Sequence, residues 1–246
     1  MFKKTGLMIA VAALATLSGC NKAPDAAQKP ATAGVAAPAG TNWVETVSET
    51  AENGMLMGNP AAPIKLLEYG ALSCPHCATF SKQSREGLKA MIATGKVSYE
   101  LRTFLIHPQL DLPASILAKC NGPAPFFGVV ENMFDRQQEW MGQDKFALLT
   151  PAVQAGWASM SPNQIAGDVA TRLGLITFVS QFGVGEAKAK ACLADPAAFA
   201  KLETMMKEAD SQYKIQSTPT FIINGQKVEG VDDWAALQIE MKKVGA

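Results

Sequence analysis

Cys74-Pro75-His76-Cys77 is the stretch of this sequence that decides the fold. An apolar run over residues 64–69 precedes it, as in a buried strand, and apolar residues at helical spacing follow it over residues 80–92. The pattern therefore predicts that Cys74 lies at a strand-to-helix junction. Unpaired backbone N–H groups and the helix dipole favour an anion at such a position. We expect a lowered thiol pKa and a nucleophilic thiolate at Cys74.

The other residues of the motif fit the same interpretation. Pro75 suits the first helical turn, where its missing N–H costs nothing. Cys77 lies on the same helix face as Cys74 and is close enough to form a disulfide with it. His76, between the two sulfurs, can donate a hydrogen bond or carry charge near the thiolate. The alternatives are half of a zinc site or a structural disulfide. A zinc site needs a second close pair of ligands, whereas the remaining candidates are scattered along the chain: Cys120, Cys192 and His107.

A second segment points independently to the same chemistry, and it reads STPTFIINGQKV over residues 217–228. Residues 221–223 predict a buried strand, and Asn224-Gly225 is a strong hairpin signal. Pro219 cannot donate to the ladder of a central strand, so it belongs at the entrance of this strand.

Together the two segments resemble the thioredoxin superfamily, and more narrowly the DsbA-like thiol–disulfide oxidoreductases. The resemblance covers residues 55–110 and 185–246, and it implies an α/β thioredoxin fold. It also implies a cis Thr218–Pro219 bond that faces the C-x-x-C motif and offers the Thr218 backbone to a substrate strand. The alternative is a trans proline that merely begins a strand.

Glu68 is an acidic residue in an otherwise apolar strand, six residues before Cys74. Acidic side chains are seldom buried without a partner or a task. By resemblance, Glu68 occupies the position of the family's buried acid, which assists proton movement when Cys77 must act as a nucleophile. The alternative is a carboxylate that points outward from a sheet edge.

The N-terminus has the pattern of an export signal. Lys3 and Lys4 precede an apolar stretch over residues 6–17, which is too short to span a bilayer. Residues 17–20 read LSGC and match the lipobox of bacterial lipoproteins, in which Cys20 becomes the acylated first residue. A stray cysteine in an ordinary signal peptide is the alternative. We predict a signal peptide over residues 1–19 and lipidation of Cys20.

Residues 20–41 are rich in Ala and Pro and lack hydrophobic periodicity, which predicts a flexible tether behind the lipid anchor. Asn21 is not the aspartate that resembles an inner-membrane retention signal. We therefore expect a periplasmic protein anchored in a membrane, with the outer membrane favoured over the inner.

The cysteine count predicts one further bond. The chain has five cysteines, of which Cys20 would be blocked by lipidation. If Cys74 and Cys77 pair, the other bond within the chain can only join Cys120 and Cys192. An oxidising compartment favours this structural disulfide. Two free buried thiols are the alternative.

The rest of the chain predicts one α/β domain over residues 42–246. After a strand-like alternation over residues 96–105, helix-period apolar residues run from Leu112 to Lys214, and a last helix follows over residues 232–244. This order predicts a thioredoxin fold split by a helical insertion at about residues 111–190. Without Lys3 and Lys4 the chain carries 20 basic and 22 acidic residues and shows no basic run, so nothing suggests nucleic-acid binding.

The sequence thus predicts a periplasmic thiol:disulfide oxidoreductase, a dithiol oxidase that acts on unfolded or reduced exported proteins. It needs no metal or organic cofactor, because the Cys74–Cys77 disulfide carries the two electrons. A membrane redox partner would recycle a monomeric enzyme. The alternatives are a disulfide isomerase or reductase of the same fold and a non-enzymatic lipoprotein that binds metal or peptide.

Overall fold

The computed structural model describes residues 36–246. The predicted signal peptide and Cys20 lie outside the described residues, as does the predicted tether up to residue 35. Residues 36–41 contain no helix or strand, and the first element is a short 3-10 helix, η1 (Trp43–Glu45).

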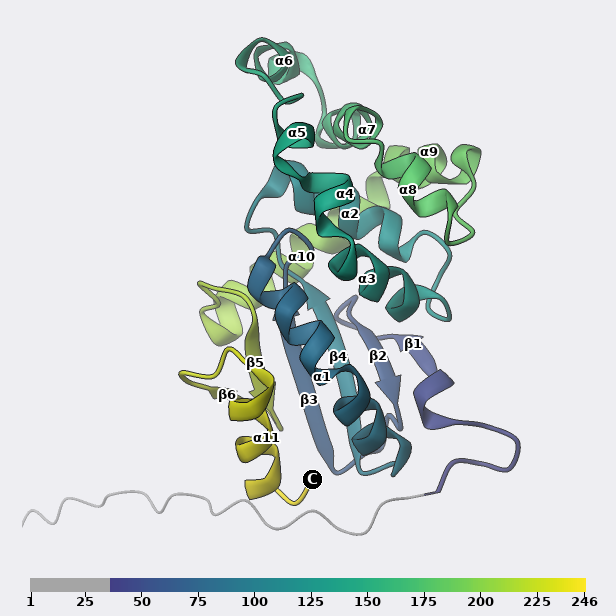
Figure 1. The fold of residues 1–246 in the computed structure, drawn as a ribbon, viewed down its shortest axis with the longest axis vertical. Coiled ribbons are helices and arrows are strands. Elements are labelled where there is room, and N and C mark those ends of the chain that lie inside the picture. Colours follow the sequence, from purple (N-terminus) through teal and green to yellow (C-terminus); the bar gives the residue numbers. More distant parts are fainter. Residues whose placement is uncertain (1–35) are drawn as a thin grey trace, which may run out of the picture.

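A six-stranded mixed sheet forms the centre of the described chain (Figure 1). Its order is β1-β2-β4-β3-β5-β6, with β3 parallel to β4 and antiparallel to β5. The apolar run before the cysteine motif forms β3, and the NG hairpin joins β5 to β6, as predicted. The strands are β1 (Val47–Glu49), β2 (Met55–Gly58), β3 (Ile64–Gly70), β4 (Val97–Thr103), β5 (Thr220–Ile223) and β6 (Gln226–Val228).

Helix α1 (Pro75–Ala93) begins directly after β3 and packs on one face of the sheet beside α11 (Trp234–Lys243) (Figure 1). Pro75 occupies its first turn, and the buried positions recur every three or four residues, as an amphipathic helix requires. The Phe80 ring packs on the Phe221 ring of β5, with 4.6 Å between ring centroids. The carboxyl end of α10 covers the opposite face through a smaller core that includes Tyr69, Ala209 and Ile222.

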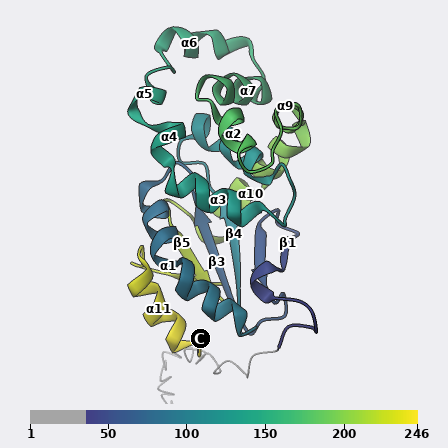
Figure 2. The same cartoon turned by 45° about the vertical axis from the view of Figure 1, so that its right-hand side comes forward.

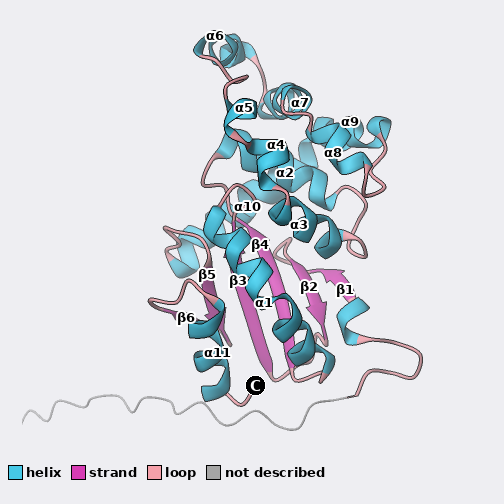
Figure 3. Ribbon diagram, in the orientation of Figure 1, coloured by secondary structure: helices cyan, strands magenta, loops and turns pink. Residues whose placement is uncertain are grey.

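The helical region lies between β4 and β5 in sequence and is stacked on the end of the sheet from which α1 begins (Figures 1 and 2). In Figure 3 this region is made of cyan helices joined by loops, and the magenta strands lie below it. The helices are α2 (Pro108–Lys119), α3 (Phe126–Asp135), α4 (Gln137–Met141), α5 (Gln143–Phe146), α6 (Pro151–Gly156), α7 (Pro162–Arg172), α8 (Leu175–Ser180), α9 (Glu186–Ala194) and α10 (Pro196–Tyr213), with the 3-10 helix η2 (Trp157–Ser159) after α6. The predicted α/β architecture with a helical insertion is confirmed.

Local signals set several helix starts in this region. Ser161 caps α7 in a capping box with Gln164, and the Asp195 side chain accepts a hydrogen bond from the Ala197 N–H at the start of α10. The large apolar residues of α3 and α4 are buried in the core of this region: Phe126, Phe127, Met133, Phe134 and Trp140. No helix within residues 36–246 has the length and apolar character needed to cross a membrane.

Candidate active site

Cys74 is the N-cap residue of α1, at the strand-to-helix junction that the sequence predicts. Its side chain is 5% exposed and that of Cys77 is fully buried, and both are free thiols. The Cys74 Sγ donates to the Thr218 carbonyl oxygen at 3.3 Å. The Thr218–Pro219 peptide bond is cis. The structure therefore brings together two segments that are 144 residues apart in sequence.

The surroundings of the two cysteines lower the pKa of the Cys74 thiol and raise that of the Cys77 thiol. A hydrogen bond from the Cys77 thiol is the largest cause that lowers the Cys74 pKa, to about 5. Burial opposes this effect, while the Thr218 side chain and the backbone N–H groups of Cys77 and His76 add to it. Burial raises the pKa of Cys77 well above its ordinary value, and hydrogen bonding to Cys74 and the charge of Glu68 raise it further. At neutral pH only Cys74 is ionised.

The Thr218 hydroxyl is a second group that faces Cys74. Thr218 is buried, and its Oγ1 has no hydrogen-bond partner among the described residues while Cys74 is a protonated thiol. Because the same side chain lowers the Cys74 pKa, the hydroxyl is placed to donate to the thiolate rather than to the thiol. An ionised Cys74 thus gains a hydrogen bond that the neutral form lacks.

Glu68 is buried in β3, with 1% of its surface exposed, so the outward-pointing alternative is wrong. Burial is the main cause that raises the pKa of Glu68 to about 7. The Tyr99 hydroxyl donates to Oε2 at 2.6 Å and lowers this pKa, whereas the charge of Cys74 raises it. Gly70 gives the carboxylate its space, because a Cβ there would lie 2.8 Å from Oε1. A carboxyl group with a pKa raised in this way can take up or release a proton near neutral pH.

A small cavity of about 40 Å³ adjoins Glu68 between α1, α3 and the sheet. This volume exceeds the roughly 10–15 Å³ that one water molecule needs. Its lining includes the polar and charged residues Glu68, Tyr99, Arg85, Lys89 and Glu131. Lys89 and Arg85 form ion pairs with Glu131 there. A water in this cavity could exchange a proton with the buried carboxyl group.

Sequence reasoning missed the residues that hold the loop before α1. Asp111 of α2 accepts hydrogen bonds from the Ser73 N–H at 2.8 Å and the Ser73 hydroxyl at 2.9 Å. Gln137 of α4 donates to the Leu72 and Cys74 carbonyl oxygens. Asp111, an acid in an apolar helix, was a signal that the sequence offered. Gln137 carried none, because its acceptors are 63 and 65 residues away.

The remaining predicted site residues take different positions. Pro75 and His76 are exposed at the start of α1, so they form part of the surface around Cys74. His107 directly precedes α2, and its Nδ1 lies 2.9 Å from the Ser73 hydroxyl. Within residues 36–246 no cluster of three or more His, Cys, Asp or Glu side chains could hold a metal ion.

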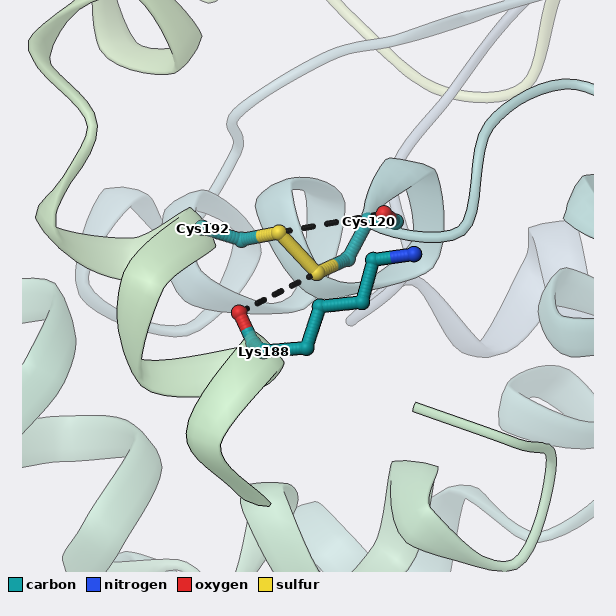
Figure 4. Close-up of a disulfide and its surroundings, with 3 residues drawn as sticks. All are labelled: Cys120, Lys188 and Cys192. Carbon is teal, nitrogen blue, oxygen red and sulfur yellow. Dashed lines mark hydrogen bonds between the residues drawn. A yellow bond between two sulfur atoms is a disulfide. The ribbon is translucent and has the colours of Figure 1, made fainter. Parts of the chain in front are cut away.

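Cys120 and Cys192 are joined in a disulfide that links the end of α2 to α9 (Figure 4). The pairing is the one that the cysteine count left for these residues. Each sulfur lies near a carbonyl oxygen, Lys188 O at 3.5 Å from Cys120 Sγ and Cys120 O at 3.8 Å from Cys192 Sγ. Because disulfide sulfurs carry no proton, these are contacts without hydrogen bonds.

Comparison with known proteins agrees with this geometry. A family model described as thioredoxin matches residues 50–243. The chain belongs to this thioredoxin family. Within it, the chain is 30% identical over 181 residues to a candidate protein-disulfide oxidoreductase of Rickettsia bellii, a match that covers 72% of this chain and 60% of the Rickettsia protein. The chain thus spans about three fifths of the length of the curated relatives it matches.

Two solved structures extend the comparison of this thioredoxin-family chain. The protein-disulfide isomerase from Novosphingobium aromaticivorans has a TM-score of 0.69 and 28% identity, and the match covers 76% of this chain and 94% of that one. Alpha-DsbA1 of Wolbachia pipientis has a TM-score of 0.60 and 21% identity over 78% of this chain and 90% of that one. The second likeness concerns the fold alone.

Proposed function

We propose that this chain is a DsbA-like thiol:disulfide oxidoreductase, and that it acts as a dithiol oxidase on exported proteins. One observation carries the proposal. Cys74 is the N-cap residue of α1, its sulfur contacts the Thr218 carbonyl, and its pKa is about 5, while Cys77 lies buried behind it with a raised pKa. Such a pair has one sulfur that can be attacked and one that is protected from solvent.

The reaction consists of two thiol–disulfide exchanges. In the oxidised enzyme, a substrate thiolate attacks Cys74, the Cys74–Cys77 bond breaks, and Cys77 leaves and takes up a proton. A second substrate thiolate then attacks the substrate sulfur that is bonded to Cys74 in the mixed disulfide, so that Cys74 leaves as a thiolate. The substrate gains a disulfide, and the enzyme gains two electrons and one proton. The second substrate proton passes to solvent, because Cys74 stays ionised at neutral pH.

Glu68 supplies the proton step in this scheme. Its carboxyl group has a pKa of about 7 and influences the pKa of Cys77. It can therefore donate a proton to the leaving Cys77 sulfur and recover one through water in the adjacent cavity. In the reverse direction the carboxylate accepts the proton that Cys77 must lose before it resolves a mixed disulfide.

The lowered pKa of the Cys74 thiol supports a role as an oxidant of substrate thiols. The native pKa of Cys74 lies about 5 against an ordinary value of 9.0, so the stabilisation is complete above pH 9 and is lost as the pH falls through 5. At pH 7, midway between these two pKa values, the stabilisation of the thiolate corresponds to about 3 kcal/mol in favour of the reduced protein. Solvent screening at the mouth of the site reduces this figure. A stabilised reduced form makes the disulfide a better oxidant.

The N-terminal pattern supports the proposed location. With the predicted signal peptide and lipidation of Cys20, the enzyme would act in the periplasm on a lipid anchor, with the outer membrane favoured. Its partners would be unfolded or reduced exported proteins and a membrane redox protein that reoxidises Cys74 and Cys77. The electrons are carried by the cysteine pair itself, without a metal or an organic cofactor.

A second candidate function is disulfide isomerisation or reduction, and the name of the similar Novosphingobium structure favours it. The two functions differ in the assay that they satisfy. We expect the oxidised chain to restore disulfides in a reduced, denatured protein faster than it reduces insulin with a thiol cofactor. Rapid insulin reduction without net oxidation would favour the second function. Absence of both activities, with bound zinc or copper, would favour a non-enzymatic carrier.

A further inference from the structure

The loop between β3 and α1 is held by two side chains of the helical region. Gln137 Nε2 donates to the carbonyl oxygens of Leu72 at 2.8 Å and Cys74 at 3.0 Å. Asp111 Oδ1 accepts from the Ser73 N–H at 2.8 Å, and its Oδ2 accepts from the Ser73 hydroxyl at 2.9 Å. Three consecutive residues that end at the nucleophile are therefore fixed from outside the thioredoxin core.

Both side chains are buried. Asp111 is fully buried and Gln137 is 7% exposed. A buried polar group is costly unless it is hydrogen-bonded, and a buried acid more so. Asp111 also accepts from the His107 N–H at 2.8 Å, so its two oxygens are satisfied by three donors. Because hydrogen bonds depend on both distance and angle, these bonds restrict the loop backbone to a narrower range of conformations than apolar packing would.

The position of the loop decides what surrounds the Cys74 sulfur. Cys74 Sγ reaches Thr218 O at 3.3 Å, and the backbone N–H groups of His76 and Cys77 lie near enough to favour its ionised form. Hydrogen bonds weaken steeply once distance and angle leave the ideal range. A small shift of the loop would therefore cost several of these contacts at once.

We propose that Gln137 and Asp111 are positioning residues that hold the Cys74 sulfur against Thr218 and the first turn of α1. This inference rests on the proposed redox role of Cys74. It assigns to the helical insertion a task beyond covering the sheet, because Asp111 comes from α2 and Gln137 from α4. The two side chains touch neither sulfur and act only through the backbone of the loop.

The chain offers a matched control for Gln137. Asn163 of α7 also donates its amide to two backbone carbonyl oxygens, those of Leu193 at 2.8 Å and Asp195 at 3.0 Å. Both acceptors belong to the helical region, and none of these contacts involves the loop before α1. Asn163 is less buried than Gln137, so replacing it by Leu should cost less stability than Gln137→Met does, without moving Cys74.

The test is the pH dependence of Cys74 alkylation by iodoacetamide in the reduced full-length protein, with denaturant unfolding measured alongside. We expect Gln137→Met to raise the alkylation midpoint by at least one pH unit and to shift the glutathione equilibrium about tenfold towards the oxidised protein. Asn163→Leu should leave both unchanged. Asp111→Asn, which keeps one acceptor oxygen for the Ser73 N–H, should give a smaller rise and preserves a test if Gln137→Met fails to fold.

Wild-type midpoints in both loop variants would overturn the positioning role. An equal shift in Asn163→Leu would overturn it too, because loss of stability alone would then explain the change. The alkylation assay needs no substrate and no turnover. A wild-type protein that fails to oxidise substrates would therefore count against the proposed function. The positioning role of Gln137 and Asp111 would still be decided by the alkylation midpoints.

Discussion

The described chain contains two cysteine pairs in opposite states. Cys74 and Cys77 are free thiols three residues apart at the start of α1, whereas Cys120 and Cys192 are 72 residues apart and form a disulfide. The sulfur of Cys74 meets groups that favour an anion: a thiol, a hydroxyl and two backbone N–H groups.

The sulfurs of the second pair lie beside the carbonyl oxygens of Lys188 and Cys120 (Figure 4), as Cys74 lies beside that of Thr218. A carbonyl oxygen carries negative partial charge and disfavours a thiolate beside it. Around Cys74 the thiol, hydroxyl and N–H donors outweigh this effect, because its pKa is lowered overall. Surroundings, rather than residue type, thus separate the reactive cysteine from the structural ones.

The largest effect is expected on reactivity. Cys74→Ser should lower the rate of substrate oxidation by at least about a thousandfold, because a serine hydroxyl can neither form the disulfide nor leave as a thiolate. The Cys120→Ala/Cys192→Ala double variant should stay within about threefold of the wild type at a temperature where it is folded. Oxidation of a dithiol peptide followed by fluorescence gives both rates. Comparable losses in the two variants would remove the distinction between the pairs.

The second effect concerns the free energy of unfolding, and it comes from the Cys120–Cys192 pair. Removal of the Cys120–Cys192 bond should lower the free energy of unfolding by about 4 kcal/mol, since the bond closes a loop of 72 residues in the unfolded chain. Urea denaturation of the double variant and of the wild type, with Cys74 and Cys77 in the same redox state in both, measures this value. A loss below about 1 kcal/mol would show that this disulfide is not a structural staple.

A smaller effect is expected from Glu68→Gln in the reduced protein. The native pKa of Glu68 is about 7 against an ordinary 4.5, so its stability contribution is complete below pH 4.5 and is lost as the pH rises through 7. The permanently neutral amide avoids that loss. The variant should gain about 2.5 kcal/mol over the wild type at pH 8 relative to pH 5. Denaturant unfolding at both pH values checks this, and parallel pH profiles would contradict a buried, titrating carboxyl group.

Much of the fold was predictable because its signals are local. Pro75 at the first turn of α1, the apolar run of β3 and the NG hairpin each need only a few neighbouring residues. Ser161 and Asp195, each followed directly by proline at the first turn of a helix, are local signals of the same kind. The short strands β1 and β2 were not predicted, because three or four residues give little periodicity and their pairing depends on β4.

The candidate site was predictable in part. Glu68 was conspicuous as an acid in an apolar strand, whereas its partner Tyr99 looked like any residue of an alternating strand. Their meeting depends on the parallel register that sets Glu68 opposite Leu101, two residues beyond Tyr99. Gln137 and Asp111 reach the loop from helices whose packing no local pattern specifies. Long-range contacts of this kind became visible only in the structure.

The most direct measurement is the equilibrium redox potential of the Cys74–Cys77 pair against glutathione at pH 7. A Cys74 thiolate stabilised as described should place the potential above about −180 mV, towards the strongly oxidising value of about −120 mV known for DsbA. A potential near the −270 mV or so of thioredoxin would contradict the account, because the site would then favour the disulfide over the thiolate.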